Sequence, residues 1–164
     1  MKIIQRENPI HSKPVEIAVF DESPRFRLYL PSSILEDENE LYNQVLFFGL
    51  IIADEEMTIR QRALADLCRF DGSTQNGGVG MGFEVFNVYE SGDEKNSPHF
   101  QPFLQLLRDI GADEYLQVIE SSLNSETIDA TEINRAYFDI KPDLVTLATH
   151  YVARFPDEWI LIAK

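Results

Sequence analysis

The chain has 164 residues, of which 44% are hydrophobic and 11% aromatic, and it contains one cysteine. This composition excludes global disorder, and a lone cysteine excludes an internal disulfide framework. The formal net charge is −14, which argues against direct binding to nucleic acid or to an anionic membrane, because both need basic side chains. No apolar run approaches the ~20 residues that span a bilayer, and no signal-like segment opens the chain. We therefore expect one soluble, cytoplasmic domain.

The first 31 residues contain four of the eight prolines, and short segments of β-forming residues lie between them at 15–20 and 26–30. Proline restricts the backbone to extended or turn conformations, and alternating apolar residues favour strands. The pattern predicts an extended N-terminal arm, residues 1–31, that belongs to the same domain as the rest.

From Ser32 onward the pattern is helical, and the prediction is a helical domain over residues 32–164. Residues 40–53 are apolar almost all round and predict a buried helix, and a second helix is expected over 58–70. Ser97 and Pro98 suggest the start of a third helix, which Gly111 ends. Three more helices are expected over 113–123, from about 129, and from about 141 to 155.

The C-terminal segment 159–163 is too apolar to remain unpacked. The fold class expected from these elements is mainly α, a single helical domain with an extended N-terminal arm. The alternative is an α+β domain in which the arm and the C-terminal segment form a small sheet.

Residues typical of catalytic or metal centres are scattered. The three histidines, His11, His99 and His150, lie far apart in sequence and show no metal-ligand spacing with each other or with Cys68. The glycines of 78–82 lack the strand context of a dinucleotide-binding motif. A calcium-loop alignment from Asp71 places glycine where the bidentate glutamate is needed. We therefore expect no metal, no cofactor and no enzymatic activity.

Negative charge is concentrated in two parts of the chain. Residues 36–56 contain seven acids and no base, and residues 109–143 contain nine acids against two bases. This segregation favours a dedicated acidic surface for a positively charged partner. A solvated acidic face without a partner is the simpler alternative.

The central part of the chain resembles a known family. The Asn-Gly-Gly turn at 76–78, the aromatic segment 83–87 and the Ile-Gly-Ala junction at 110–112 carry the likeness, which covers roughly residues 40–123. They are similar to a bacterial family of acidic proteins that mimic double-stranded DNA and bind a helix-turn-helix transcription factor. Here residues 79–82 separate the turn from the aromatic segment, which loosens the match in this loop.

The resemblance implies a DNA mimic whose carboxylates replace phosphates against a basic protein surface, with no direct contact to nucleic acid. Duplex DNA carries one charge per ~1.7 Å of axis, and helical residues four apart lie about 5–6 Å apart at Cβ. Glu36 and Glu40, and Asp109 and Asp113, have that spacing in sequence. The expected partner-binding residues are Glu36, Asp37, Glu38, Glu40, Asp54, Glu55 and Glu56, with Asp109, Asp113 and Glu114 as a second group.

Two further hypotheses remain open at this point. An immunity protein that neutralises a basic toxin nuclease would have the same composition. An enzyme would require a histidine in a pocket beside a buried carboxylate with a shifted pKa. For the DNA mimic we expect a homodimer, since half-sites of dimeric repressors lie about 34–36 Å apart, with the subunits meeting at the arm and at residues 159–162.

Overall fold

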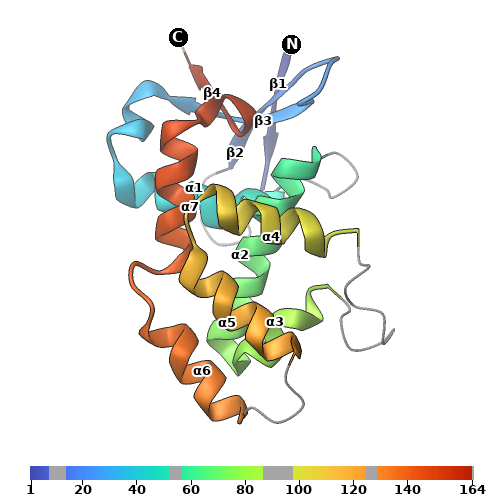
Figure 1. The fold of residues 1–164 in the computed structure, drawn as a ribbon. Coiled ribbons are helices and arrows are strands. Elements are labelled where there is room, and N and C mark those ends of the chain that lie inside the picture. The colour runs from blue at the N-terminus through green and yellow to red at the C-terminus, as the bar shows by residue number, and fades with distance from the viewer. Residues whose placement is uncertain (8–13, 52–56, 87–97, 125–128, 164) are drawn as a thin grey trace. The chain divides into compact units, whose positions relative to one another are not determined.

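A computed structural model of the chain describes all residues except 8–13, 52–56, 87–97, 125–128 and 164 (Figure 1). The chain divides into two compact units. Unit 1 comprises residues 1–65 and 148–164, and unit 2 comprises residues 66–147. The expectation of a single domain with an arm remains a prediction.

Unit 1 contains a four-stranded sheet that both ends of the chain build (Figure 1). Strands β1 (Lys2–Arg6), β2 (Val15–Val19) and β3 (Phe26–Pro31) are antiparallel neighbours, and β4 (Ile160–Ala163) lies parallel to β3. Leu28 is paired with Ile160, and the Leu28 amide donates to the Trp159 carbonyl at 2.8 Å. The N-terminal arm is therefore a set of strands, and this pairing of the two termini is consistent with the α+β alternative.

Helices make up most of the described residues, as the mainly α prediction expected. In unit 1 the 3₁₀-helix η1 (Ser32–Leu35) leads to α1 (Glu38–Ile51), whose Leu41, Val45 and Phe48 are buried. The first part of α2 (Ile59–Gly77), the last part of α7 (Leu144–Arg154) and the 3₁₀-helix η4 (Pro156–Glu158) complete this unit. The prediction of a helix over 40–53 is confirmed for residues 40–51, and most of its large apolar side chains are buried, although Leu50 is 54% exposed.

Helices α1 and α2 touch where Gly49 meets Ala65 in unit 1. A Cβ atom added to Gly49 would lie 2.6 Å from the Ala65 Cβ and 2.9 Å from its Cα. Carbon atoms do not approach this closely, so a larger residue must push the two helices apart. Glycine is here the residue that permits close helix packing.

We predict that Gly49→Ala lowers the free energy of unfolding by about 1–2 kcal/mol, because overpacking outweighs the gain in helix propensity. Gly72→Ala is the matched control, since Gly72 also lies inside a helix but has no atom within 4 Å of an added Cβ. That control should be stabilised by up to about 1 kcal/mol. Urea unfolding followed by far-UV circular dichroism measures both. Equal effects of the two substitutions would contradict the packing argument.

Unit 2 packs the rest of α2 with α3 (Val79–Glu84), α4 (Phe100–Asp109), α5 (Asp113–Asn124), α6 (Ala130–Asp139) and the start of α7. Phe70 lies at the centre of its aromatic core, with ring centroids 5.5 Å from Phe83, 5.2 Å from Phe103 and 6.1 Å from Tyr137. Phe83 belongs to α3, Phe103 to α4 and Tyr137 to α6, so three different helices bring an aromatic side chain to this ring. The Phe70–Phe83 pair is edge-on, and edge-on aromatic pairs stabilise a core beyond the area that they bury.

Most helix boundaries in unit 2 agree with the prediction. Gly111, at φ +74°, ends α4, and the Asp129 side chain caps α6 by accepting from the Thr131 amide at 2.9 Å. The predicted end of α2 near Asp71 is wrong, because the helix continues to Gly77, where Gly78 at φ +85° ends it. The predicted start at Pro98 is also wrong, since α4 begins at Phe100, and the predicted cap Ser97 lies outside the described residues.

Candidate functional site

The first group of predicted carboxylates lies around the start of α1 in unit 1. We call Glu36, Asp37, Glu38 and Glu40 the first acidic cluster, and all four side chains are exposed. The Asp37 carboxylate accepts from the Glu40 amide at 3.0 Å and so caps the helix, and Glu40 accepts from Gln44 Nε2 at 2.9 Å. Local hydrogen bonds therefore fix the orientation of two of these carboxylates. Asp54, Glu55 and Glu56, the other predicted members, lie outside the described residues.

His150 joins the first acidic cluster from another element. Its Nε2 lies 2.7 Å from Glu38 Oε1, and both side chains are more than half exposed. This contact ties the start of α1 to α7 within unit 1. Sequence spacing gave no partner for His150, because Glu38 lies 112 residues away and no local pattern connects the two.

The second group, Asp109, Asp113 and Glu114, surrounds the turn between α4 and α5 in unit 2. We call these residues the second acidic cluster, and all three are exposed. Asp109 Oδ1 accepts from Gln105 Nε2 at 2.9 Å, while Asp113 and Glu114 occupy the first turn of α5. Acidic residues in a first helical turn interact favourably with the helix dipole. The two clusters belong to different units.

Neither pair of carboxylates with the four-residue separation lies on one helix, so the Cβ spacing of helical neighbours does not apply to them. Glu36 precedes α1 and closes η1, whereas Glu40 lies inside α1. Asp109 is the last residue of α4 and Asp113 the first of α5, with the left-handed Gly111 between them. Both pairs straddle a helix start, because acidic side chains are favoured at the N-cap and in the first turn of a helix.

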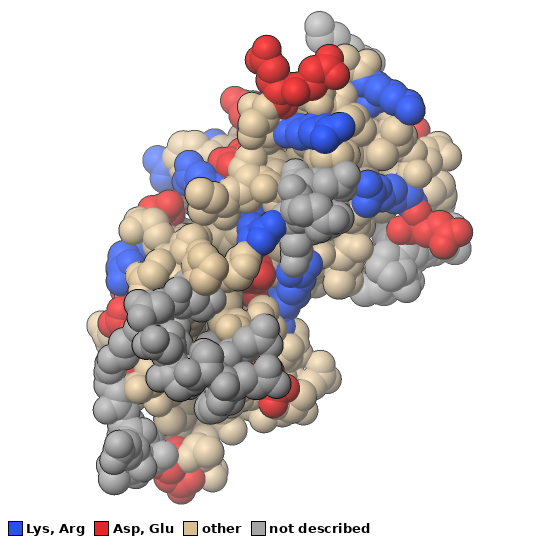
Figure 2. All heavy atoms as spheres, turned by 90° about the vertical axis from the view of Figure 1, so that its right-hand side faces the viewer, with Lys and Arg blue, Asp and Glu red and all other residues tan. Residues whose placement is uncertain are grey.

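The acidic excess is larger in unit 2. Its residues include fifteen acids and five bases, whereas the residues of unit 1 include thirteen acids and nine bases. Figure 2 shows one face of the molecule, on which acidic and basic side chains are interspersed. Negative charge is therefore not uniform over the surface, and the two acidic clusters are local features.

The residues that carry the family resemblance have structural roles in unit 2. Asn76 Nδ2 donates to the Gly72 carbonyl at 2.8 Å, within α2. Gly78 has a positive φ, and its neighbour Val79 donates its amide to Asn134 Oδ1 at 2.8 Å. A side chain on Gly78 would collide with Asn134. This part of the motif shapes the turn between α2 and α3.

A buried polar pair lies in the core of unit 2. Tyr137 donates its hydroxyl to Asp71 Oδ1 at 2.8 Å, and both residues are buried. Burial raises the pKa of the Asp71 carboxyl, while hydrogen bonds from Tyr137 and Gln75 oppose that rise. Burial also raises the pKa of the Cys68 thiol to about 12, so Cys68 stays a neutral buried side chain, as expected of a small hydrophobic residue.

One histidine lies near a buried carboxylate. His99 Nδ1 is 4.0 Å from Asp66 Oδ2, and Asp66 is also 3.4 Å from Arg69. Among the described residues, no group of three or more His, Cys, Asp or Glu side chains could hold a metal ion. The expectation that the protein is not an enzyme stays a prediction.

Trp159 does not lie at a free surface, contrary to its predicted place in a subunit contact. Its side chain is 2% exposed, with the ring 5.7 Å from Tyr151 in an edge-on arrangement. Ile160, the first residue of β4, is also buried. A large aromatic side chain next to a strand buries much apolar area in the core between a sheet and a helix. Substitution of Trp159 by aspartate would therefore disrupt unit 1 itself and would not test dimerisation.

No helix in the described part of the chain is long and apolar enough to cross a membrane. Comparisons with protein-family models, with curated proteins and with solved structures give no match. The two acidic clusters and their surroundings are therefore the features from which a function can be inferred.

Proposed function

We propose that this protein is a DNA mimic that binds the basic DNA-binding surface of a bacterial helix-turn-helix transcription factor and keeps that factor from its operator. The observation that carries the proposal is the first acidic cluster. Its four carboxylates are exposed, and the Asp37 and Glu40 side chains are held by hydrogen bonds at the start of α1.

Fixed carboxylates suit this role for a physical reason. A basic protein surface that binds DNA faces phosphates held in a rigid backbone, and much of its affinity comes from charge neutralisation. A flexible acidic tail would lose conformational entropy when it binds. Carboxylates that are already oriented at a helix start lose less conformational entropy, which favours binding.

The second acidic cluster supports the proposal independently, in unit 2. Asp109, Asp113 and Glu114 are exposed around one turn, in the unit with fifteen acids against five bases. We further propose that the protein acts as a homodimer, because two copies would offer two equivalent surfaces to the two half-sites of a dimeric factor.

The test is a competition experiment with fluorescent operator DNA bound to candidate helix-turn-helix repressors. The wild-type protein should displace the DNA, and the triple variant Glu36→Gln, Glu38→Gln, Glu40→Gln should need about 30-fold more protein. This follows from about 0.5–1 kcal/mol for each exposed charge pair. Asp37 is kept, because it caps α1. The displacement should also weaken steeply from low to physiological salt.

The control variant is Glu16→Gln, Asp21→Asn, Glu22→Gln, which removes the same charge from exposed positions in β2 and the connection after it. It should displace DNA almost as well as the wild type. Equal losses in both variants would show a dependence on net charge alone. Failure of the wild type to displace DNA from any factor, combined with inhibition of a basic nuclease, would favour the immunity-protein alternative.

A further inference from the structure

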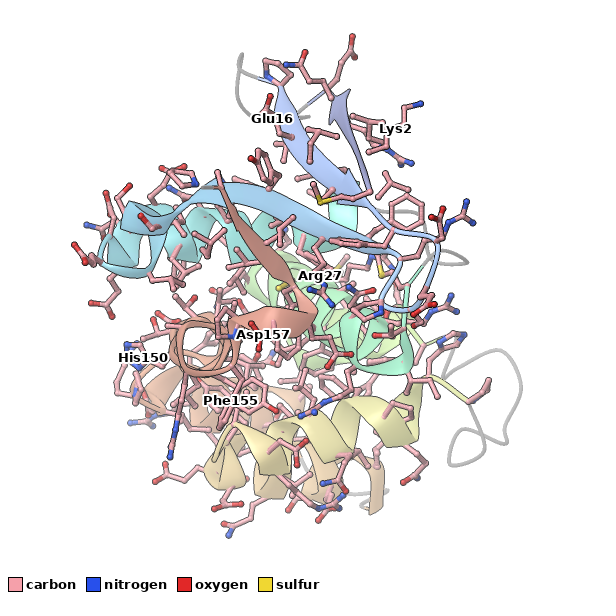
Figure 3. The ribbon with its side chains drawn as sticks, turned by 90° about the horizontal axis from the view of Figure 1, so that it is seen from above. Lys2, Glu16, Arg27, His150, Phe155 and Asp157 are labelled. Carbon is pink, nitrogen blue, oxygen red and sulfur yellow. The ribbon has the colours of Figure 1, made fainter. Side chains whose placement is uncertain are left out.

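A hollow of about 520 Å³ opens at the end of α7, between the start of α2 and η4. All of its lining residues belong to unit 1. They include three aromatic side chains, two arginines and two acids. In Figure 3, Asp157 lies on one side of α7 and His150, which contacts the first acidic cluster, on the other.

The aromatic side chains form one continuous wall. The Tyr151 ring lies 5.2 Å from the Phe155 ring and 5.7 Å from the Trp159 ring, measured between centroids. Trp159 forms the buried end of this wall, whereas Phe155 is 50% exposed. A half-exposed phenylalanine beside a hollow offers apolar surface that a ligand can cover, at about 25 cal/mol per Å².

The two arginines differ in their electrostatic surroundings. Arg60 lies 3.7 Å from Glu158 Oε2 and hydrogen-bonds to the Tyr151 hydroxyl, and Glu158 also accepts from the Thr58 hydroxyl at 2.7 Å. These contacts compensate the charges of Arg60 and Glu158. Arg154 lies over the Phe155 ring, 5.3 Å from its centroid, and has no ion pair with any residue that the structure describes.

This arrangement selects among ligand classes. A cation that binds through aromatic faces would find guanidinium groups already over the Tyr151 and Phe155 rings. A neutral apolar ligand would leave the charge of Arg154 unused. A ligand with an anionic group beside an aromatic ring can pair with Arg154 through the anion and contact the exposed part of Phe155 with the ring.

We propose that this hollow binds an aromatic carboxylate, with its carboxylate at Arg154 and its ring against Phe155. The site is separate from the acidic clusters and does not depend on the proposed transcription-factor partner. The exposed Asp157 also lines the hollow, and its negative charge opposes an anionic ligand. Removing the Asp157 charge should therefore strengthen binding, whereas removing the Arg154 charge should weaken it.

Trp159 is the only tryptophan of the chain and lines the hollow, so its fluorescence reports binding directly. Titration of the full chain with N-acetylphenylalanine should give saturable quenching. N-acetylphenylalanine amide, which keeps the ring and lacks the charge, should bind about tenfold more weakly. N-acetylglycine, which keeps the carboxylate and lacks the ring, should also bind about tenfold more weakly.

Arg154→Gln should weaken the binding of N-acetylphenylalanine about fivefold, and Asp157→Asn should strengthen it about twofold. Arg135→Gln removes an exposed arginine of unit 2 and should leave the affinity for N-acetylphenylalanine unchanged. A peptide that ends in phenylalanine with a free carboxylate, compared with its amidated form, tests whether a chain terminus can supply the same chemistry. Binding of the free acid alone assigns a small molecule, and tighter binding of the peptide assigns a polypeptide end.

Three results would overturn the proposal. The first is the absence of saturable quenching up to about 10 mM N-acetylphenylalanine, a weaker complex than such a site should form. The second is equal affinity for the acid and its amide. The third is unchanged affinity in Arg154→Gln, with far-UV circular dichroism confirming that this variant is folded.

Discussion

Replacing Gln61 with leucine should lower the free energy of unfolding by about 3–5 kcal/mol. Gln61 is fully buried near the start of α2, and its Nε2 donates to the carbonyls of Phe26 and Glu158, both at 2.7 Å. Its Oε1 accepts from the Thr58 amide at 3.0 Å. One side chain thereby joins the start of a helix to β3 and to η4.

The size of the effect follows from the groups that the substitution leaves unpaired. Leucine keeps a similar volume but leaves the Phe26 and Glu158 carbonyls and the Thr58 amide without this partner. Each buried polar group that loses its hydrogen bond costs about 1–3 kcal/mol. Thr58 and Gln61 also form a capping box, since the Gln61 amide donates to the Thr58 hydroxyl at 3.1 Å.

Urea unfolding followed by far-UV circular dichroism and by Trp159 fluorescence measures this prediction. Gln117→Leu is the control, because Gln117 is exposed on α5, and it should change stability by less than about 0.5 kcal/mol. A loss below about 1 kcal/mol in Gln61→Leu would show that the hydrogen bonds of Gln61 are replaced by others.

The stability of Asp71→Asn, relative to the wild type, should increase as the pH rises from about 4 to 7. Burial raises the folded-state pKa of Asp71 above the usual value of 3.8. The folded protein therefore keeps this proton to a higher pH than the unfolded chain does. The stability that the protonated carboxyl contributes is complete below the unfolded pKa and is lost as the pH rises through the folded pKa. Asparagine cannot titrate, so the variant does not lose stability at this position as the pH rises.

Urea unfolding at several pH values measures the difference between the two proteins. Tyr137→Phe removes a hydrogen bond that favours the ionised Asp71 carboxylate and should raise the Asp71 pKa further. The loss of stability with rising pH should therefore continue to a higher pH in this variant than in the wild type. Asp139→Asn is the control for the removal of one exposed charge. Parallel profiles for Asp71→Asn and the wild type would contradict the assignment of a buried, destabilising charge to Asp71.

The acidic clusters show how much of a candidate site can be predicted from sequence. The sequence identified Glu36, Asp37, Glu38 and Glu40 as a concentration of charge, and all four are exposed. It predicted the helix start at Glu40, two residues too late, because the start depends on a capping contact, here from the Glu40 amide to the Asp37 carboxylate. The contact of Glu38 with His150 depends on how α1 and α7 meet, which no local pattern encodes.

Local interactions explain which parts of the fold the sequence determined by itself. The Asp129 cap, the left-handed Gly111 and the apolar residues of α1 and α5 act within a few residues, so their signals are readable along the chain. Only the tertiary structure decided the parallel pairing of β3 with β4, because strand partners distant in sequence are chosen by burial. It also decided that Gln61 and Asp71 are buried, since a polar side chain enters a core only where distant elements supply its hydrogen bonds.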